Sequence, residues 1–297
     1  MHHTQPPTLK ELRPHGTKTF PFATYKTPFC QKGTIVKHHW HDEIEMIYFS
    51  EGNFRLEINM EPFIIYSECL YFINPGELHS ISTNTSSGFE EAIVFSPHMI
   101  SFESYDTTQM QLIHPIQNGK LLFPRCILPD HPTFVPIRDT FVELMNMCRD
   151  DALTYQLYTK SSLLRILALL SASRLFVPAE KNYDKRVDEL KKIITYIMEN
   201  YREKIYIRDL AALVNMNEQY FCRFFKKAIG HSPMEYTNEY RIKQSMQLLK
   251  ETDLPVTEIC LECGFNNLGN FLKEFRKYTS TTPLKYRKNP DPGQIQA

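Results

Sequence analysis

The sequence predicts an α+β chain of two domains, in which a β-rich front half with flanking helices precedes an all-α back half. Short strand-like runs, separated by turn residues every 8–12 positions, fill residues 20–95. Beyond residue 185 the apolar residues recur almost throughout at the spacing of a helix. The back half also contains a duplicated unit of helix, tight turn and helix, which is typical of the helix-turn-helix motif.

In the front half, Phe54–Ile58 alternates apolar and polar residues, which is the period of a half-buried strand. Turn residues at 50–53 precede this run and predict a hairpin. Residues 63–66 and Cys69–Ile73 are further strand candidates, and an Asn-Pro-Gly turn ends the second one. This spacing of short strands predicts a small β-barrel or sandwich.

The period becomes helical over 135–149 and 154–175. The second segment is apolar on nearly all sides, so it either lies in a core or contacts another subunit. Residues 96–133 have no clear period and support no detailed prediction.

The expected boundaries are a first domain at 15–176, a linker at 177–184 and a second domain at 185–290. Pro178 would break the preceding helix, and charged residues follow it. The chain has no net charge, but residues 1–180 carry 14 Lys and Arg against 19 Asp and Glu, whereas the rest carry 20 against 15. Any contact with nucleic acid is therefore expected in the back half.

Three features favour a cytoplasmic protein without a membrane span. No apolar run reaches 18 residues. The N-terminus lacks the apolar core of a signal peptide. The seven cysteines are unevenly spaced and fit reduced thiols; Cys260 and Cys263 have no second pair to complete a metal site, so we expect them to be structural.

The duplication is the most informative feature of the back half. Residues 209–217 match 258–266 at an offset of 49, and one inserted residue later the offset becomes 50, which pairs Phe221 with Phe271. The second helix of such a unit enters the major groove of DNA. A repeat of helical hairpins that binds protein is the alternative.

Each copy has residues suited to the tight turn between its helices. Gly264 tolerates a positive φ, and Asn215, at the matching position of the first copy, is the next most tolerant residue type. Asn217 in the first copy, and Asn266 or Asn267 in the second, can cap the helix that follows.

Residues 184–287 resemble the DNA-binding domain of the AraC/XylS family of transcription regulators. The segments that carry the resemblance are YFCRFFKKAIGHSPMEY, RIKQSMQLL, EICLECGF and FLKEFRKYTSTTPLKYR. The resemblance implies two helix-turn-helix units, joined by a long helix over 233–249, that read two successive segments of the major groove. Helical spacing then places Phe221, Phe224 and Phe225 in the core of the first unit.

The side chains on the opposite face of each second helix are the expected DNA contacts. Arg223 can bond guanine and Gln219 can pair with adenine, whereas lysines near the helix ends suit phosphates. Leu268 and Gly269 occupy positions where the family often has polar side chains that read bases. The second helix-turn-helix unit is therefore expected to contribute more to positioning the protein on DNA than to reading base pairs. The candidates are Glu218, Gln219, Cys222, Arg223, Lys226, Lys227, Asn267, Asn270, Lys273, Arg276 and Lys277.

A cluster of histidines in the front half has the spacing of a cupin motif. The pattern G-x5-H-x-H-x3-E-x6-G runs from Gly33 to Gly52, and PGELH, which ends at His79, matches part of a second motif. These residues resemble the cupin barrel, a usual front end of AraC/XylS regulators. In metal-binding cupins the matching positions, here His39, His41, Glu45 and His79, hold one divalent ion. Such a donor set would suit zinc, iron, manganese or nickel.

The second cupin motif is incomplete, so an organic effector without a metal is favoured over a metal site. The residues expected to line the ligand site are His39, Trp40, His41, Glu45, Tyr48 and His79. The resemblance implies a regulator that responds to a sugar or other small molecule, binds duplex promoter DNA, contacts RNA polymerase and pairs with a second copy through the 135–175 helices. A metal-dependent cupin enzyme, or a metal-sensing regulator that uses the four metal-ligand candidates, is the alternative. No Ser/His/Asp set or Gly-rich nucleotide loop points to an enzyme.

Overall fold

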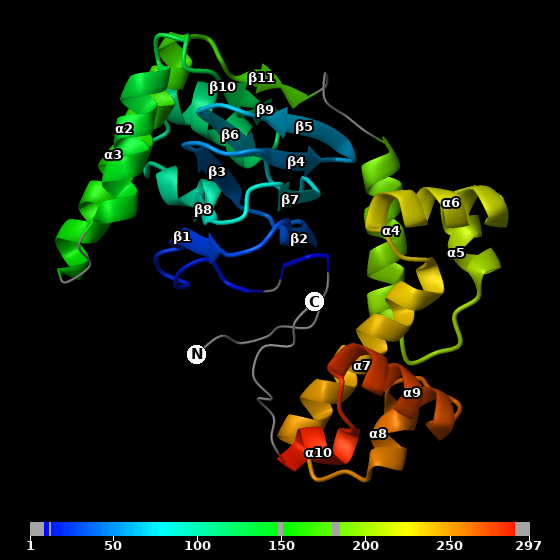
Figure 1. The fold of residues 1–297 in the computed structure, drawn as a ribbon. Coiled ribbons are helices and arrows are strands. Elements are labelled where there is room, and N and C mark those ends of the chain that lie inside the picture. The colour runs from blue at the N-terminus through cyan, green and yellow to red at the C-terminus, as the bar shows by residue number, and fades with distance from the viewer. Residues whose placement is uncertain (1–8, 12, 148–150, 180–184, 289–297) are drawn as a thin grey trace. The chain divides into compact units, whose positions relative to one another are not determined.

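A computed structural model describes residues 9–11, 13–147, 151–179 and 185–288 of the chain (Figure 1). These residues divide into two compact units, 13–179 and 9–11 with 185–288, and each is described by itself. The first unit is rich in strands and the second is helical, which confirms the predicted fold class. Among the described helices, none combines the length and apolar character needed to cross a membrane.

The strands of the first unit form two antiparallel sheets. In hydrogen-bonded order, the first sheet holds β1 (Phe22–Phe29), β8 (Gly88–Phe95), β3 (Ile44–Phe49), β6 (Cys69–Ile73) and β10 (Cys126–Ile127). The second sheet holds β2 (Gly33–His39), β7 (His79–Thr83), β4 (Phe54–Ile58) and β5 (Glu61–Ile65). No strand pairing joins these two sheets in the described residues, so the predicted barrel is an open sandwich rather than a closed ladder.

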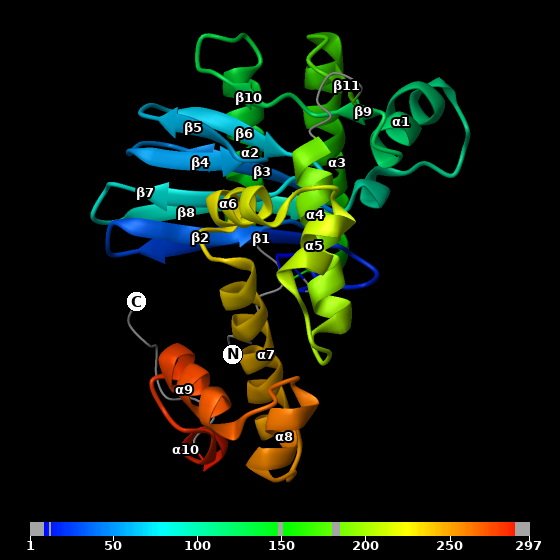
Figure 2. The same cartoon turned by 90° about the vertical axis from the view of Figure 1, so that its right-hand side faces the viewer.

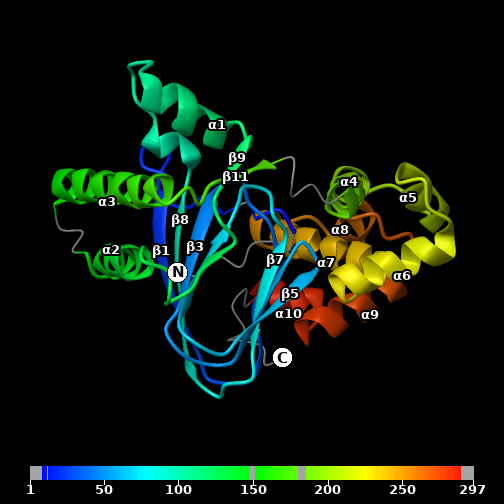
Figure 3. The ribbon, with the colours of Figure 1, turned by 90° about the horizontal axis from the view of Figure 1, so that it is seen from above.

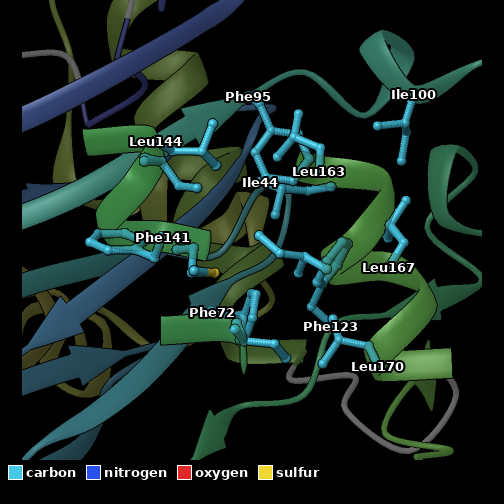
Figure 4. Close-up of a cluster of buried hydrophobic side chains, with 14 of the residues drawn as sticks. Ile44, Phe72, Phe95, Ile100, Phe123, Phe141, Leu144, Leu163, Leu167 and Leu170 are labelled. Atoms are coloured by element: carbon cyan, nitrogen blue, oxygen red, sulfur yellow. The ribbon is translucent and has the colours of Figure 1, made fainter. Parts of the chain in front are cut away.

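The central strand β3 is buried on both faces. Ile47 and Phe49 pack between the sheets against residues of β4 and β7. Ile44 and Met46 point the other way, into a core that the first sheet shares with helices (Figure 4). Successive side chains of a strand point to opposite faces, so a strand covered on both sides has a continuous apolar run.

Two helices cover the outer face of the first sheet (Figure 3). They are α2 (Phe134–Asn146) and α3 (Ala152–Ala172), which correspond to the helices predicted over 135–149 and 154–175. The Asp151 side chain caps α3 by accepting a hydrogen bond from the Leu153 N–H at 3.1 Å.

Residues 96–133, which had no clear period, form short elements. These are the 3₁₀ helix Pro97–Ile100, the π-helical turn Gln109–Ile113, α1 (His114–Gln117), β9 (Leu121–Leu122) and β10. The predicted linker begins later than expected, because Val177–Pro178 form strand β11 paired with β9. Residues 180–184 of that linker lie outside the described residues.

The second unit has seven helices in its described residues. They are α4 (Lys185–Asn200), α5 (Ile207–Leu213), α6 (Glu218–Ile229), α7 (Pro233–Glu251), α8 (Val256–Glu262), α9 (Leu268–Thr279) and α10 (Pro283–Lys288). α5 with α6, and α8 with α9, are the two predicted helix-turn-helix units, and α8, α9 and α10 pack on the long helix α7 (Figure 2). Ser232 and Glu235 start α7 with a complete capping box.

Candidate functional site

The two helix-turn-helix units have matching turns. Asn215 has φ of 54° and Gly264 has φ of 77°, so both turns use the left-handed conformation at the positions that the repeat aligned. The side-chain oxygen of Asn217 accepts from the Tyr220 N–H at 2.9 Å, and that of Asn267 accepts from the Asn270 N–H at 3.1 Å. The predicted caps are therefore Asn217 and Asn267, and α6 and α9 begin at equivalent points.

Behind each second helix lies a pair of fully buried phenylalanines. Phe221 and Phe225 anchor α6 in the core of its unit, and Phe271 and Phe275 anchor α9 in the same way. Phe224, predicted to be in the core, is only half-buried. The buried pairs set the rotation of each helix about its axis and so decide which side chains face outward.

Most of the predicted contact residues lie on the exposed faces of α6 and α9. Cys222 differs, because it is half-buried. The exposed ones are Glu218, Gln219, Arg223, Lys226 and Lys227 on α6, and Asn270, Lys273, Arg276 and Lys277 on α9, with Asn267 at its cap. Six of these are cations, and the lysines and arginine near the helix ends also interact favourably with the negative ends of the helix dipoles.

Two exposed residues of these helices were missed from the sequence. Tyr220 is 49% exposed and aligns with Asn270 at the offset of 50, while Leu272 is 40% exposed and aligns with Cys222. Applying the repeat to every candidate in both directions would have found both. Residue type alone does not mark these two positions, because an aromatic or aliphatic side chain can also face DNA.

In the first unit, the four metal-ligand candidates meet between the sheets. Oε2 of Glu45 lies 3.3 Å from Nε2 of His41 and 3.0 Å from Nε2 of His79. His39 pairs with His79 in the β2–β7 register, and their ring centroids are 4.2 Å apart. One ring nitrogen from each of the three histidines lies within 4.8 Å of those of the other two. The structure thus brings together all four residues that the motif spacing singled out.

Backbone carbonyls determine which nitrogen of each ring carries the proton. The Nδ1 atoms of His39, His41 and His79 lie 2.9, 3.2 and 2.9 Å from the carbonyl oxygens of Lys37, Glu43 and Glu77. A carbonyl oxygen only accepts, so each Nδ1 must donate, and in a neutral ring Nε2 then presents a lone pair.

The lone pairs on Nε2 create an electrostatic conflict with Glu45. Two neutral rings would direct them at the same carboxylate oxygen, and the buried Nε2 of His79 forms no hydrogen bond despite its short distance from Glu45. The contact becomes favourable when a proton is shared between a ring nitrogen and the carboxylate, or when a cation binds between them. Three imidazoles and one carboxylate are side-chain types that could hold a divalent ion.

Burial changes the ionisation of this cluster. Burial and the nearby His79 ring lower the pKa of His39 to about 3, which keeps it neutral. Burial by itself would raise the pKa of Glu45, but its contacts with His41 and His79 hold the pKa well below its usual range. The interior site therefore contains one carboxylate among imidazoles.

His15 is a further member of the site that no motif signalled. Its Nδ1 atom lies 2.8 Å from the hydroxyl of Tyr25, and its ring centroid is 5.1 Å from that of His41. Burial and the nearby His41 ring lower its pKa to about 4. Gly16 fixes this loop, since it has φ of 90° and a Cβ atom there would lie 2.5 Å from the carbonyl oxygen of Phe20.

Tyr48 does not join the interior site. It lies on the face of β3 opposite to that of Glu45, where its hydroxyl donates to Glu68 at 2.5 Å and its ring packs on Phe141. The expectation that Tyr48 lines the ligand site is corrected by the alternation of side chains along the strand. Trp40, which lies between His39 and His41 in the sequence, is buried.

Comparison with known proteins identifies the class to which this fold and these sites belong. A family model described as an AraC-like ligand binding domain matches residues 29–167, and one described as a helix-turn-helix domain matches residues 210–289. The chain belongs to the AraC family of transcriptional regulators, with an N-terminal ligand-binding domain and a C-terminal DNA-binding domain, and this membership makes it a regulator rather than an enzyme.

Several relatives match over most of their length. An uncharacterized HTH-type transcriptional regulator of Bacillus subtilis, YdeC, is 26% identical over 94% of this chain and 96% of its own. The HTH-type transcriptional activator RhaS of Enterobacter sp. strain 638 is 23% identical over 89% and 91%. Among solved structures, ToxT of Vibrio cholerae covers 90% of this chain and 98% of its own at 13% identity, with a TM-score of 0.40.

Proposed function

We propose that this regulator binds promoter DNA through both helix-turn-helix units and that an effector bound in its strand-rich unit, residues 13–179, changes that binding. The observation that carries the proposal is the equivalence of α6 and α9: each follows a left-handed turn, starts at a capping asparagine and presents three exposed cations. Two equivalent helices fit two successive segments of the major groove.

The exposed side chains of α6 and α9 fall into those that suit base contacts and those that suit phosphate contacts. Arg223 and Gln219, in the first half of α6, have the hydrogen-bonding groups for guanine and adenine, whereas Lys226, Lys227, Arg276 and Lys277 suit phosphates. The second helix-turn-helix unit has apolar Leu268 and Leu272 beside Asn270 and Lys273, so it contributes fewer polar base contacts than the first.

Selection of binding sites from a random duplex library with the full-length protein tests this function. We expect a recovered consensus with two half-sites about one helical turn apart. Binding should weaken steeply with salt, because up to four phosphate contacts release counterions. If the folded protein retained no duplex even at low salt, the proposed function would be wrong.

The effector is expected to be a neutral polar molecule such as a sugar. The interior site contains hydrogen-bonding imidazoles, the Tyr25 hydroxyl and the Glu45 carboxylate, which suit hydroxyl groups and would repel an acid. The test is a thermal-shift screen of sugars, sugar acids and other small acids against the full chain. Neutral sugars should raise the melting temperature more than the acids do. Stabilisation only by acids would contradict this assignment.

A divalent ion is a second candidate for the same site. The chemistry of the site fits an ion at His39, His41, His79 and Glu45. Backbone carbonyls accept hydrogen bonds from Nδ1 of each of the three histidines, and Nε2 of His41 and of His79 lies close to Glu45. A bound ion would supply the positive charge that this contact requires and a coordination position for an effector oxygen. Elemental analysis of gently purified protein should find about one ion per chain, and its absence after reconstitution would remove this candidate.

We further propose that the regulator acts in the cytoplasm as a homodimer that contacts RNA polymerase. The support for pairing is on α3, where Leu153 is 76% exposed and Leu157 is 69% exposed one turn later. Large apolar side chains at successive turns of one helix face favour association with a second copy. Relatives named transcriptional activators support contact with the polymerase.

A further inference from the structure

The connection between α4 and α5 leads directly into the first helix-turn-helix unit and contacts the second. The ring of Tyr201 packs edge-on against Tyr240 of α7, with centroids 5.1 Å apart. A Cβ atom on Gly264, in the turn of the second unit, would lie 2.4 Å from the carbonyl oxygen of Tyr201 and 2.8 Å from that of Arg202. The two units therefore meet where the backbone of Gly264 touches residues 201–202, with no room for a side chain.

Arg241 of α7 closes this junction. Its Nε donates to the carbonyl oxygen of Tyr201 and its Nη2 to that of Glu203, both at 2.7 Å. The guanidinium carbon lies 5.7 Å from the ring centroid of Phe265, which follows Gly264 in the second turn. One side chain thus holds two carbonyls of the first unit and one ring of the second.

Burial of the Arg241 guanidinium at this junction costs free energy. This cost favours a role for the positions of its hydrogen-bond partners rather than for packing alone. Arg241 is only 7% exposed, and its hydrogen-bond partners here are carbonyl oxygens rather than a carboxylate. Burial lowers its pKa, because the charged form loses hydration that the carbonyls replace only in part. A methionine of similar length would fill the same volume without this cost, but it could not hold both carbonyls in place.

Two helices that read one duplex must keep a set separation and rotation. One added base pair moves the second half-site by about 3.4 Å along the axis and by roughly 34° around it. A side chain contact is lost with a displacement of this size, so the junction between the units controls which spacings are accepted.

We propose that Arg241 is a positioning residue that sets the number of base pairs between the two half-sites. It acts by fixing residues 201–203 of the first unit against Phe265 of the second. This inference rests on the proposed function, because both units must bind DNA for a spacing to exist.

The test uses the full-length protein and the duplex recovered by selection, with the spacer at its selected length and one base pair shorter or longer. We expect the wild type to lose affinity about tenfold or more for each altered spacer, a loss on the scale of one lost base contact. Arg241→Met should shrink that penalty to about threefold or less while it keeps most of the affinity for a single half-site.

Arg287→Met is the matched control. Its Nη2 donates to the carbonyl of Leu254 at 2.6 Å within the second unit, so this variant also removes an arginine–carbonyl bond but leaves the junction intact. It should keep the wild-type spacing penalty. A second junction variant, Gly264→Ala, should reproduce the relaxed spacing, because its methyl group would push residues 201–202 away.

Three results would overturn the inference. One is an unchanged spacing penalty in a folded Arg241→Met protein, and another is an equal relaxation in Arg287→Met. The third is failure of both Arg241→Met and the milder Arg241→Lys to fold, which would make the residue purely structural. A wild-type protein that binds no specific duplex would instead refute the proposed function, and this inference would be rejected with it.

Discussion

Nε2 of His79 lies 3.0 Å from Oε2 of Glu45, and the two residues come from different sheets of the first unit. At this end of the sandwich the sheets are therefore joined by polar side chains rather than by strand pairing. His41 contacts the same carboxylate oxygen from the connection between β2 and β3. A cation placed among them would bind both sheets and the connection at once.

Glu45→Gln should abolish binding of a divalent ion to this site. The substitution removes the one negative charge and keeps the shape, so the imidazoles alone would hold the ion more weakly. The measurement is the rise in melting temperature with zinc, nickel or manganese, which should fall to near zero in the variant. His38→Gln is the control, because His38 contacts Glu57 and Ser80 instead of this cluster. Equal metal stabilisation in wild type and Glu45→Gln would assign the ion to another site.

Glu90→Gln should make the protein more stable above neutral pH. Burial and the nearby Glu45 raise the pKa of Glu90 from 4.5 to about 8 in the fold. Between these values the unfolded chain releases a proton that the folded chain keeps, so the free energy of unfolding falls as pH rises.

The glutamine variant removes this dependence. Its melting temperature should exceed that of the wild type by several degrees at pH 8, and the two should converge toward pH 4.5, since each pKa unit corresponds to about 1.4 kcal/mol. Glu91→Gln, which removes the neighbouring carboxylate paired with Lys26 at 2.8 Å, is the control and should not show this gain. Parallel pH profiles of wild type and Glu90→Gln would refute the assignment.

Arg223→Ala and Lys227→Ala should weaken DNA binding in different ways. Loss of Arg223 should reduce discrimination between the selected site and sites with one altered base pair, by about 1–3 kcal/mol at that position. Loss of Lys227 should weaken all duplexes alike and lower the salt slope by about one. Competition binding at several salt concentrations separates the two effects, and unchanged discrimination in Arg223→Ala would refute its reading role.

Leu157→Glu should separate the proposed homodimer into monomers. A charge at this exposed apolar position of α3 would be buried without a partner in the paired state. Sedimentation measurements should show a loss of the dimer at concentrations where the wild type pairs. Gln156→Glu, which adds the same charge at the adjacent exposed position, should leave pairing intact. A monomeric wild type, or an unaltered dimer in Leu157→Glu, would contradict the proposed interface.

Local chemistry was enough to predict much of the second unit. Phe221 and Phe225 recur at helical spacing and Asn217 has the residue type that caps helices, so the sequence predicted the two recognition helices, although it left the second cap open between Asn266 and Asn267. The periodicity also predicted α2 and α3, and motif spacing singled out His39, His41, Glu45 and His79. Apart from His79, which only the resemblance to the cupin motifs linked to the other three, these features depend on residues a few positions apart, whose relation is set by backbone geometry alone.

Tertiary structure decided the relations between distant segments. It placed His15 against His41 and arranged the strands as two sheets instead of a closed barrel. It also brought Arg241 to carbonyls 38 and 40 residues away. No local pattern marks such contacts, because a backbone carbonyl or a loop histidine has no periodicity and acquires its partner only when separate elements pack together.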